Sequence, residues 1–494
     1  MSLFKIDVPD GVTRQGTIYQ VGMRWWDTSH TRVYLGNRMP IGGWVSRLAS
    51  TLTGAPRAMI SWRGNDGTKY YAVATHSKLY VATPTRTAMV DITPAGFTAG
   101  RADAVAAGGY GSGTYGSSTY GDPRVDSSST QPATVQSLDT FGQYLLSCSP
   151  DDGKIYEWQL DIGTPTVAAV LSGAPTSCVA VVVTPESFVV ALGAGGDKRK
   201  AQWSDQGSET TWTPSSTNQA GSYSLQTQGQ LVCGKRTRSQ TLLFTDTDVH
   251  LMTYIGLPYV YTVNRVGENC GIIAPGAAAV VGADCFWMSY NGFWRWDGAS
   301  AMEMACEVYD AVFGNLNRTQ RSKVSAWVNS QYSEIVWCYP SASSTENDSR
   351  VRYNYLENKW YLDHSVERTC GMDRGIFTNP MECDSTGHVY DAETGVSWGS
   401  VTPYFESGPL EDGAGDAITR VRRIVFDEQT QGDVRVTIYA RDWNNGSETT
   451  YGPYTSPNPV SCRIAGRQLR MKWEFLANGS FGAPRFDAIP GGKR

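Results

Sequence analysis

The sequence predicts an all-β chain: a β-propeller of six or seven blades with an N-terminal extended arm and a C-terminal antiparallel β-sandwich. Three observations predict this fold. Gly, Tyr and Trp number 52, 26 and 16 among 494 residues, and they suit turns and pleated sheets. A polar turn followed by a short apolar run ending in an aromatic residue recurs through the middle of the chain. Towards the C-terminus, apolar and polar residues alternate strictly, which is typical of half-buried strands.

The recurring phrase predicts a propeller because its spacing matches one four-stranded blade. It reads Lys154-Ile155-Tyr156-Glu157-Trp158 and later Gly292-Phe293-Trp294-Arg295-Trp296. Its apolar positions lie roughly 45 residues apart, at Ile155, Trp203, Val249, Phe293 and Val336. We count six or seven units within residues 58–400, and the unit near residues 320–365 can be divided in two ways. A ring of blades leaves only short sheet edges exposed.

Two segments precede or interrupt the repeat. Residues 1–57 predict an arm with hairpins that packs on another surface, because turn signals such as Val8-Pro9-Asp10-Gly11 alternate with strand-like runs. Residues 101–132 predict an insertion loop, since 108–121 is a Gly/Ser/Tyr segment of low complexity. Two roles are open for its regularly spaced tyrosines: contact with bases or a partner, and docking on a neighbouring subunit.

The C-terminal segment, residues 401–494, predicts a sandwich domain. Val434, Val436, Ile438 and Ala440 alternate with polar residues, and a second such strand contains Leu469, Met471, Trp473 and Phe475. Positive charge gathers at residues 420–423 and 463–472. This charge is either a solvated strand face or a contact with a subunit or nucleic acid.

Composition narrows the function classes. The net charge is −5, which argues against a protein that grips nucleic acid tightly by its phosphates. The sequence shows no signal peptide and no apolar stretch long enough for a transmembrane helix. Ten cysteines are spread singly without a CxxC pair, which predicts buried free thiols in a reducing cytosol.

We predict no catalytic, cofactor-binding or metal-binding residues and therefore no enzyme activity. The histidines have no metal-ligand spacing, and we expect structural roles for them; they are His30, His76, His250, His364 and His388. Asp246-Thr247-Asp248 resembles the start of a calcium loop but lacks its later Gly and Glu. Residues 203–212 are similar to the Asp-box turn of propeller sialidases, but the box occurs once and no carboxylate pair is marked.

Short phrases along nearly the whole chain carry a family resemblance. They include the opening Pro9-Asp10-Gly11-Val12, the motif Arg24-Trp25-Trp26 and the run from Gly36 to Trp44. The Gly-Tyr insertion and the phrases Gln202–Asp205, Asn291–Gly298, Gly452–Tyr454 and Gly466–Arg470 continue it. In these phrases the chain resembles tail hub or nozzle proteins of short-tailed bacteriophages, including packaged-DNA stabilisation proteins.

The resemblance implies a non-enzymatic virion structural protein made in the host cytoplasm. Such a subunit is implied to form a homo-oligomeric ring, a hexamer, that extends the portal and adaptor channel. The ring is implied to help retain packaged DNA, to conduct double-stranded DNA at ejection without tight sequence-specific binding, and to dock tail fibres or spikes. A net acidic chain agrees with weak DNA binding.

Two other functions remain open from the sequence. One is a cellular β-propeller interaction module that binds a partner on one face of the propeller. The other is a propeller glycosidase, which requires two carboxylates that face each other across the scissile bond.

Overall fold

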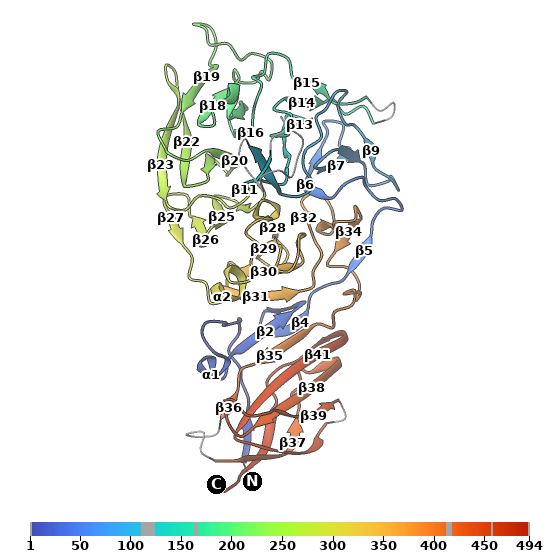
Figure 1. Ribbon diagram of the computed structural model, residues 1–494. Coiled ribbons are helices and arrows are strands. Elements are labelled where there is room, and N and C mark those ends of the chain that lie inside the picture. Colours follow the sequence, from blue (N-terminus) through green and yellow to red (C-terminus); the bar gives the residue numbers. More distant parts are fainter. Residues whose placement is uncertain (1, 110–123, 163–165, 412–416, 456–457, 493–494) are drawn as a thin grey trace.

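The chain folds into two β-rich units arranged end to end. The computed structural model describes residues 2–109, 124–162, 166–411, 417–455 and 458–492. A propeller forms the upper part of the molecule in Figure 1, and a sandwich forms the lower part. Both chain ends lie together at the far end of the sandwich (Figure 1). The predicted all-β propeller fold is confirmed.

Seven four-stranded antiparallel sheets make the propeller, which settles the blade number. Blades 1 to 4 comprise β6 (Pro56–Arg63), β7 (Lys69–Thr75), β8 (Leu79–Ala82) and β9 (Val90–Asp91); β12 (Ser137–Phe141), β13 (Tyr144–Cys148), β14 (Ile155–Trp158) and β15 (Ala169–Val170); β16 (Ala180–Val183), β17 (Val189–Leu192), β18 (Lys200–Trp203) and β19 (Gly221–Ser224); and β20 (Leu231–Arg236), β21 (Thr241–Thr245), β22 (Asp248–Gly256) and β23 (Val260–Glu268).

The remaining blades complete the ring. Blades 5 to 7 comprise β24 (Ala278–Val281), β25 (Asp284–Ser289), β26 (Gly292–Trp296) and β27 (Ala301–Glu303); β28 (Ser325–Asn329), β29 (Glu334–Tyr339), β30 (Ser349–Asn354) and β31 (Lys359–His364); and β32 (Cys370–Met372), β33 (Met381–Cys383), β34 (Val389–Ala392) and β5 (Trp44–Ser46). The innermost strands contact one another around the ring, and β32 meets β6.

The sequence repeat marks equivalent strands in four blades and shifts in a fifth. Ile155, Trp203, Val249 and Phe293 lie in the third strands of blades 2 to 5. Val336 lies in the second strand of blade 6, because a long polar turn between β29 and β30 displaces the register of the repeat. Residues 325–364 therefore form a single blade, although the sequence can be divided in two ways there.

Blade 7 is closed by a strand from the start of the chain. β5 pairs with β34, so that Val45 lies opposite Asp391 and Trp44 lies opposite Ala392. Without β5, β34 would be an exposed edge whose backbone groups lack partners. The N-terminal strand thus ties the first residues of the chain to its last blade.

The sandwich consists of two antiparallel sheets. One has the strand order β2 (Trp25–Ser29), β35 (Tyr404–Ser407), β41 (Gln468–Ser480), β38 (Gln431–Arg441) and β39 (Thr449–Tyr454), and β36 (Leu410–Glu411) also pairs with β41. The other has the order β1 (Ser2–Lys5), β42 (Arg485–Pro490), β37 (Thr419–Val425) and β40 (Val460–Gly466). The alternation predicted in β38 and β41 is confirmed, because the alternating apolar residues Val434 to Ala440 and Leu469 to Phe475 are all buried.

Residues 1–57 differ from the expected arm that packs on another surface. Their strands are members of the two units: β1 and β2 complete the two sandwich sheets, and β5 completes blade 7. The hairpin of β3 (Thr31–Tyr34) and β4 (Asn37–Pro40) lies between them. β1, β2 and β5 each satisfy their backbone groups by pairing with a strand distant in sequence, which local turn signals do not reveal.

The insertion follows blade 1. β10 (Val105–Gly109) and β11 (Arg124–Gln131) pair with each other, and residues 110–123, which include most of the Gly/Ser/Tyr segment 108–121 of the predicted insertion loop, lie outside the described residues. The base of the insertion is tied to the propeller, because Lys323 Nζ is fully buried and pairs with Asp103, and Gln320 Oε1 accepts a hydrogen bond from the Ala104 amide.

Helices are short. α1 spans Ile18–Val21 and α2 spans Tyr309–Phe313, with 3-10 turns at Ala194–Gly196 and Arg321–Lys323. In the described part of the chain, none of the helices has the length and hydropathy to cross a bilayer.

One hydrophobic cluster runs from the propeller into the sandwich. It contains Trp337 and Trp360 of blade 6 together with Trp25, Phe405 and Trp473 of the sandwich. The Trp25 and Phe405 rings lie 5.1 Å apart, and the Trp337 and Trp360 rings lie 6.2 Å apart. Because the two units share this core, we infer that they are coupled mechanically.

Candidate interaction surfaces

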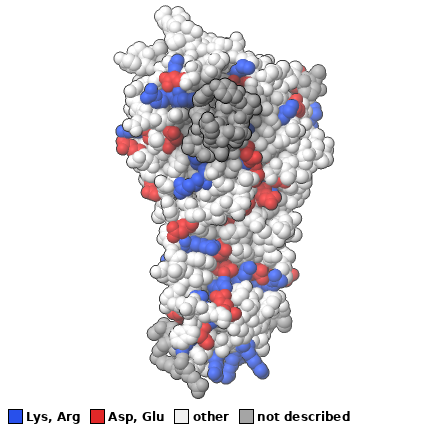
Figure 2. Space-filling view, viewed as in Figure 1, with Lys and Arg blue, Asp and Glu red and all other residues white. Residues whose placement is uncertain are grey.

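The basic residues of the C-terminal segment divide between the two sandwich sheets. Figure 2 shows Lys and Arg side chains gathered at the lower end of the sandwich. Arg463 lies on β40 beside β37, which carries the predicted 420–423 cluster. Arg470 and Lys472 lie on β41 of the other sheet, where Glu406, Glu448 and Glu474 pair with them. The predicted basic run 463–472 is therefore not one surface.

The Asp-box-like segment is a structural turn. Ser204 Oγ accepts a hydrogen bond from the Val189 amide at 3.1 Å, and Asp205 Oδ1 accepts one from the Gln219 amide at 2.7 Å. Trp212 is buried in the core between blades 2 and 3. These bonds fix the loop after β18.

The calcium-loop-like segment also makes internal contacts. Asp246 Oδ1 accepts a hydrogen bond from the Gln230 amide at 2.8 Å, and Asp248 lies 3.2 Å from His250 Nε2. Within the described residues, His, Cys, Asp and Glu side chains form no group of three that could hold a metal ion. Nine of the ten cysteines are buried and Cys306 is partly buried, as the sequence predicts.

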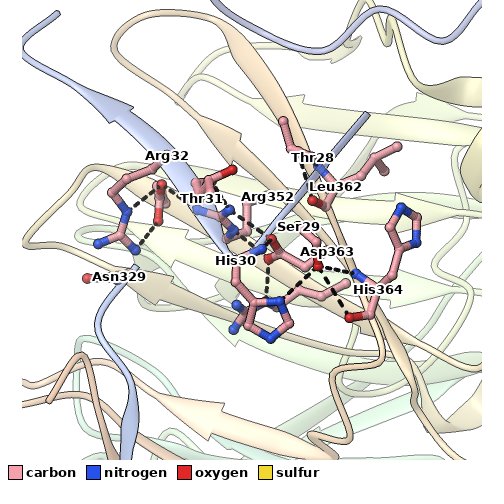
Figure 3. Close-up of polar contacts among 12 residues, drawn as sticks. Thr28, Ser29, His30, Thr31, Arg32, Asn329, Arg352, Leu362, Asp363 and His364 are labelled. Atoms are coloured by element: carbon pink, nitrogen blue, oxygen red, sulfur yellow. Dashed lines mark hydrogen bonds and ion pairs between the residues drawn. The ribbon is translucent and has the colours of Figure 1, made fainter. Parts of the chain in front are cut away.

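A buried ion network joins the leader to blades 6 and 7 (Figure 3). Its centre is Arg32, which is 2 % exposed. Arg32 Nη2 lies 3.0 Å from Glu334 Oε2, and Arg32 Nη1 donates to Glu393 Oε2 at 2.9 Å. The guanidinium also lies 3.6 Å from the centre of the Tyr332 ring. One leader residue therefore neutralises an acid from each of two blades.

Asp363 occupies the other half of this network. It accepts hydrogen bonds from Arg352 Nε at 2.7 Å and Arg350 Nε at 2.8 Å, and from the His30 amide at 2.6 Å. Arg352 Nη1 also donates to Glu334 at 3.0 Å. Burial opposes ionisation of Asp363, but the two arginines outweigh it and hold its pKa far below the usual range. Burial and the same arginines lower the pKa of His30 to about 3, which keeps His30 neutral.

A second acid-base pair lies beside the network. His364 Nε2 lies 2.8 Å from Asp27 Oδ1, so blade 6 is linked to the sandwich strand β2. Burial opposes protonation of His364, but Asp27 outweighs it and raises the pKa of His364 above 6.5. Burial raises the pKa of Asp27, but His364 and Arg14 lower it by more, so the pKa of Asp27 lies below 3.8.

This pair predicts a pH dependence of stability. The pair stabilises the folded chain fully at pH values above the pKa of Asp27 and below the pKa of His364 in the unfolded chain. This stabilisation is lost as the pH rises through the raised pKa of His364 in the folded chain. We expect His364→Gln to lower the urea midpoint more at about pH 5.5 than at about pH 9. Urea titrations of both chains at the two pH values check this result. An equal loss at both would contradict the assigned pair.

A narrow cavity lies where the innermost strands converge. Its volume is about 270 Å³, and it is lined by residues of all seven blades, including Met59, Leu138, Val182, Gly234 and Gly371. Asp139 also lines it, and burial raises the pKa of this carboxyl in spite of nearby Arg236. The cavity has room for roughly nine water molecules. It is far too small for a nucleic-acid duplex, so a DNA channel would have to lie outside the single propeller.

An apolar hairpin tip projects from blade 4. β22 and β23 have nine residues each; Ile255 at the end of β22 is 53 % exposed, and Leu257 and Tyr259 in the connecting turn are 71 and 76 % exposed. The base of the hairpin packs on blade 3, where the Tyr261 and Phe188 ring centres lie 5.2 Å apart. In Figure 1 the strands of this hairpin lie at the left side of the propeller. Contiguous exposed apolar side chains are typical of protein-binding sites.

Sequence reasoning did not identify the ion network or the hairpin. A signal for the network is the presence of charged residues within otherwise apolar runs: every residue of β30 is buried, including Arg350 and Arg352. A signal for the hairpin is Ile255-Gly256-Leu257-Pro258-Tyr259, where apolar residues surround a Gly and a Pro in a turn.

Comparison with known proteins gives likeness in structure alone. No protein family matches the chain, and no curated protein matches it. Among solved structures, the Pan2 WD40 domain of Neurospora crassa has a TM-score of 0.41 at 8 % identity and covers 72 % of this chain and 94 % of its own. YCF48 bound to a D1 peptide has a TM-score of 0.38 at 9 % identity, covering 71 % of this chain and 96 % of its own.

A nidogen/laminin complex is a further match. Its TM-score is 0.30 at 10 % identity, and it covers 51 % of this chain and 86 % of its own. At such scores these likenesses carry no argument about function. The propeller assignment rests on the seven sheets and their closure.

Proposed function

We propose that this chain is a non-enzymatic β-propeller interaction module that binds a protein partner through the β22–β23 hairpin. The observation that carries the proposal is the set of three large exposed apolar side chains at the tip of one hairpin, Ile255, Leu257 and Tyr259. Exposure of these apolar side chains to water is unfavourable, so burying them against a partner contributes favourable free energy to binding. The aromatic base orders the hairpin in advance, which lowers the entropic cost of binding.

The use of charge supports a binding role over catalysis. The most strongly perturbed carboxyl, that of Asp363, is enclosed by arginines and has 0 % side-chain exposure. Ser204 and Asp205 of the glycosidase-like turn accept backbone hydrogen bonds. These residues stabilise the scaffold that presents the hairpin.

Site-specific photo-crosslinking tests the proposal. A photoreactive phenylalanine analogue replaces Tyr259 in the full chain, in the cells that produce it, and mass spectrometry identifies the adduct. The matched control replaces Leu356, which is 72 % exposed on the turn after β30. We expect a defined adduct from position 259 and none from position 356. Similar diffuse products from both positions would contradict the proposal.

The affinity of the hairpin gives a quantitative prediction. Leu257→Asp with Tyr259→Asp is expected to weaken binding of the crosslinked partner about thirtyfold, because both changes place a charge in a desolvated contact. The control pair is Val170→Asp with Leu356→Asp, two exposed apolar residues that are not on this turn. Isothermal titration with each chain measures the change. An unchanged affinity for the hairpin variant would refute the assignment.

A second candidate function is that of a virion structural protein: a tail hub or nozzle subunit that forms a hexameric ring, docks fibres or spikes, and helps retain and conduct packaged DNA. One observation favours it. The leader phrases that carry the family resemblance contact both units: the Val12 amide donates to the Trp360 carbonyl of blade 6 at 2.8 Å, and the Phe481 amide of the sandwich donates to the Arg38 carbonyl at 3.1 Å. A family sharing those phrases is expected to share those contacts.

Crosslinking and microscopy separate the two candidates. An adduct between Tyr259 and a second copy of the chain favours a ring, whereas an adduct with a different protein favours the module. Electron microscopy of the purified chain, alone and mixed with a portal–adaptor complex, tests the ring directly. A monodisperse monomer that never joins such particles would exclude the virion structural role.

A further inference from the structure

The outer face of one sandwich sheet carries a concentrated patch of arginines. β37 contributes Arg420, Arg422 and Arg423, the neighbouring edge strand β40 contributes Arg463, and β42 on the other side contributes Arg485; all five are exposed. We call these five residues the arginine face. It belongs to the end of the sandwich where Figure 2 shows the clustered basic side chains, away from the propeller.

A β-bulge increases the density of this face. The register of β37 shifts between Val421 and Arg423 against both of its neighbours, β40 and β42. Regular alternation would point Arg423 into the core and Ile424 outward. With the bulge, Arg422 and Arg423 are both exposed, and Ile424 is completely buried. A bulge commonly re-aims a side chain in this way.

The charge of the face is largely uncompensated. Arg423 Nη2 lies 2.8 Å from Asp487, whose side chain is 3 % exposed. Among the described residues, no carboxylate forms an ion pair with the other four arginines. The face therefore presents about four free positive charges on a chain whose net charge is −5. The hollow between β37 and β40 measures about 670 Å³ and is lined by Arg420, Arg422 and Arg463.

The chemistry between the arginines favours a phosphate backbone over a protein surface. Ser461 and Ala465 are the residues on β40 that flank Arg463, and both are small and exposed. Protein interfaces typically have an apolar or aromatic centre with a polar rim, which this part of the face does not offer. Arginine forks match phosphate oxygens in a bidentate geometry, and contacts to phosphates carry most non-specific affinity for nucleic acid.

The geometry also suits a chain of phosphates. Neighbouring strands lie about 4.8 Å apart and alternate residues on one strand lie about 6.7 Å apart, so the long arginine side chains sample a continuous strip of charge. We propose that the arginine face binds nucleic acid through its phosphate groups, without reading base sequence. Nucleic-acid binding by this face is a second role, separate from the proposed protein binding, because the β22–β23 hairpin belongs to the propeller and the arginine face belongs to the sandwich.

Salt-dependent binding of a fluorescent duplex DNA to the full chain tests the proposal. Four phosphate contacts predict a slope of log K against log salt of about −3.6, or roughly a hundredfold loss of affinity between about 50 and 200 mM salt. The variant Arg420→Gln/Arg422→Gln/Arg463→Gln is expected to retain about one contact and a slope near −0.9. Fluorescence anisotropy measures both slopes.

A matched control removes the same charge elsewhere. Arg63→Gln/Arg238→Gln/Arg318→Gln changes three exposed arginines of the propeller and is expected to keep the slope of the unmodified chain. Equal slopes for the two triple variants would overturn the proposal.

Two further probes decide the class of partner. Polyglutamate of equal charge that binds as tightly, with the same dependence on the three arginines, would overturn the phosphate assignment in favour of an acidic protein. Single-stranded and duplex DNA both support the proposal if the arginine-face variant loses them, and their relative affinity identifies the preferred form. Near-ultraviolet circular dichroism confirms that each variant is folded, so loss of binding reports on the face.

Discussion

Replacing Asp363 by Asn is expected to lower the free energy of unfolding by about 3–5 kcal/mol, because it leaves buried arginines without their shared counter-charge. Asp363 accepts hydrogen bonds from Arg350 and Arg352 with both of its oxygens, and its side chain has 0 % exposure. An Asn amide would turn one of those acceptors into a donor that faces a guanidinium. Urea denaturation followed by tryptophan fluorescence measures the loss.

The control for this prediction is an ion pair in water. Arg265 and Glu268 lie 2.5 Å apart with side chains 49 and 65 % exposed, so Glu268→Gln is expected to change stability by less than about 0.5 kcal/mol. The double variant Asp363→Asn/Arg352→Gln is expected to cost less than the sum of the two single changes, because they share one interaction. Additive costs, or a loss no larger than that of the control, would show that the network is not a coupled unit.

Removing residues 1–46 is expected to prevent the rest of the chain from reaching its native structure. The deletion exposes the edge of β34 in blade 7, removes β1 and β2 from the two sandwich sheets, and leaves Glu334 and Glu393 without Arg32. The deletion therefore leaves backbone hydrogen-bonding groups and buried carboxylates without their partners. We expect loss of the near-ultraviolet circular dichroism signal and of a cooperative thermal transition.

A circular permutant provides the control for that deletion. β1 pairs with β42, and both ends of the chain lie at the same end of the sandwich (Figure 1), so residues 1–46 can follow residue 494 through a short linker. This chain retains every strand in a different order and is expected to show the native spectrum. A native spectrum from the deleted chain, or a non-native one from the permutant, would contradict the closure argument.

The sequence allows prediction of those features that depend on local periodicity. The spacing of Ile155, Trp203, Val249 and Phe293 identified equivalent strands of four blades, because each blade repeats the same burial pattern. The alternation in β38 and β41 identified the sandwich for the same reason. The position of the third strand of blade 6 was not predictable from spacing, because the polar turn between β29 and β30 is longer than the turn between the second and third strands of any other blade.

The candidate surfaces were only partly predictable. The sequence located the basic cluster at 420–423, but the pairing of β37 with β40 placed Arg463 there and excluded Arg470 and Lys472. The bulge that exposes Arg423 is a property of the register and leaves no mark in composition. The apolar hairpin was missed because Leu257 and Tyr259 resemble core residues until the turn that exposes them is placed.

By itself the sequence determined an all-β propeller joined to a sandwich, through patterns that repeat within a few residues. The tertiary structure decided that there are seven blades, that β5 closes the ring, and that Arg32 balances Glu334 and Glu393. The physical reason is range. Periodicity reports how each strand buries its own side chains, whereas closure and charge balance depend on the register between strands distant in sequence, which folding alone brings together.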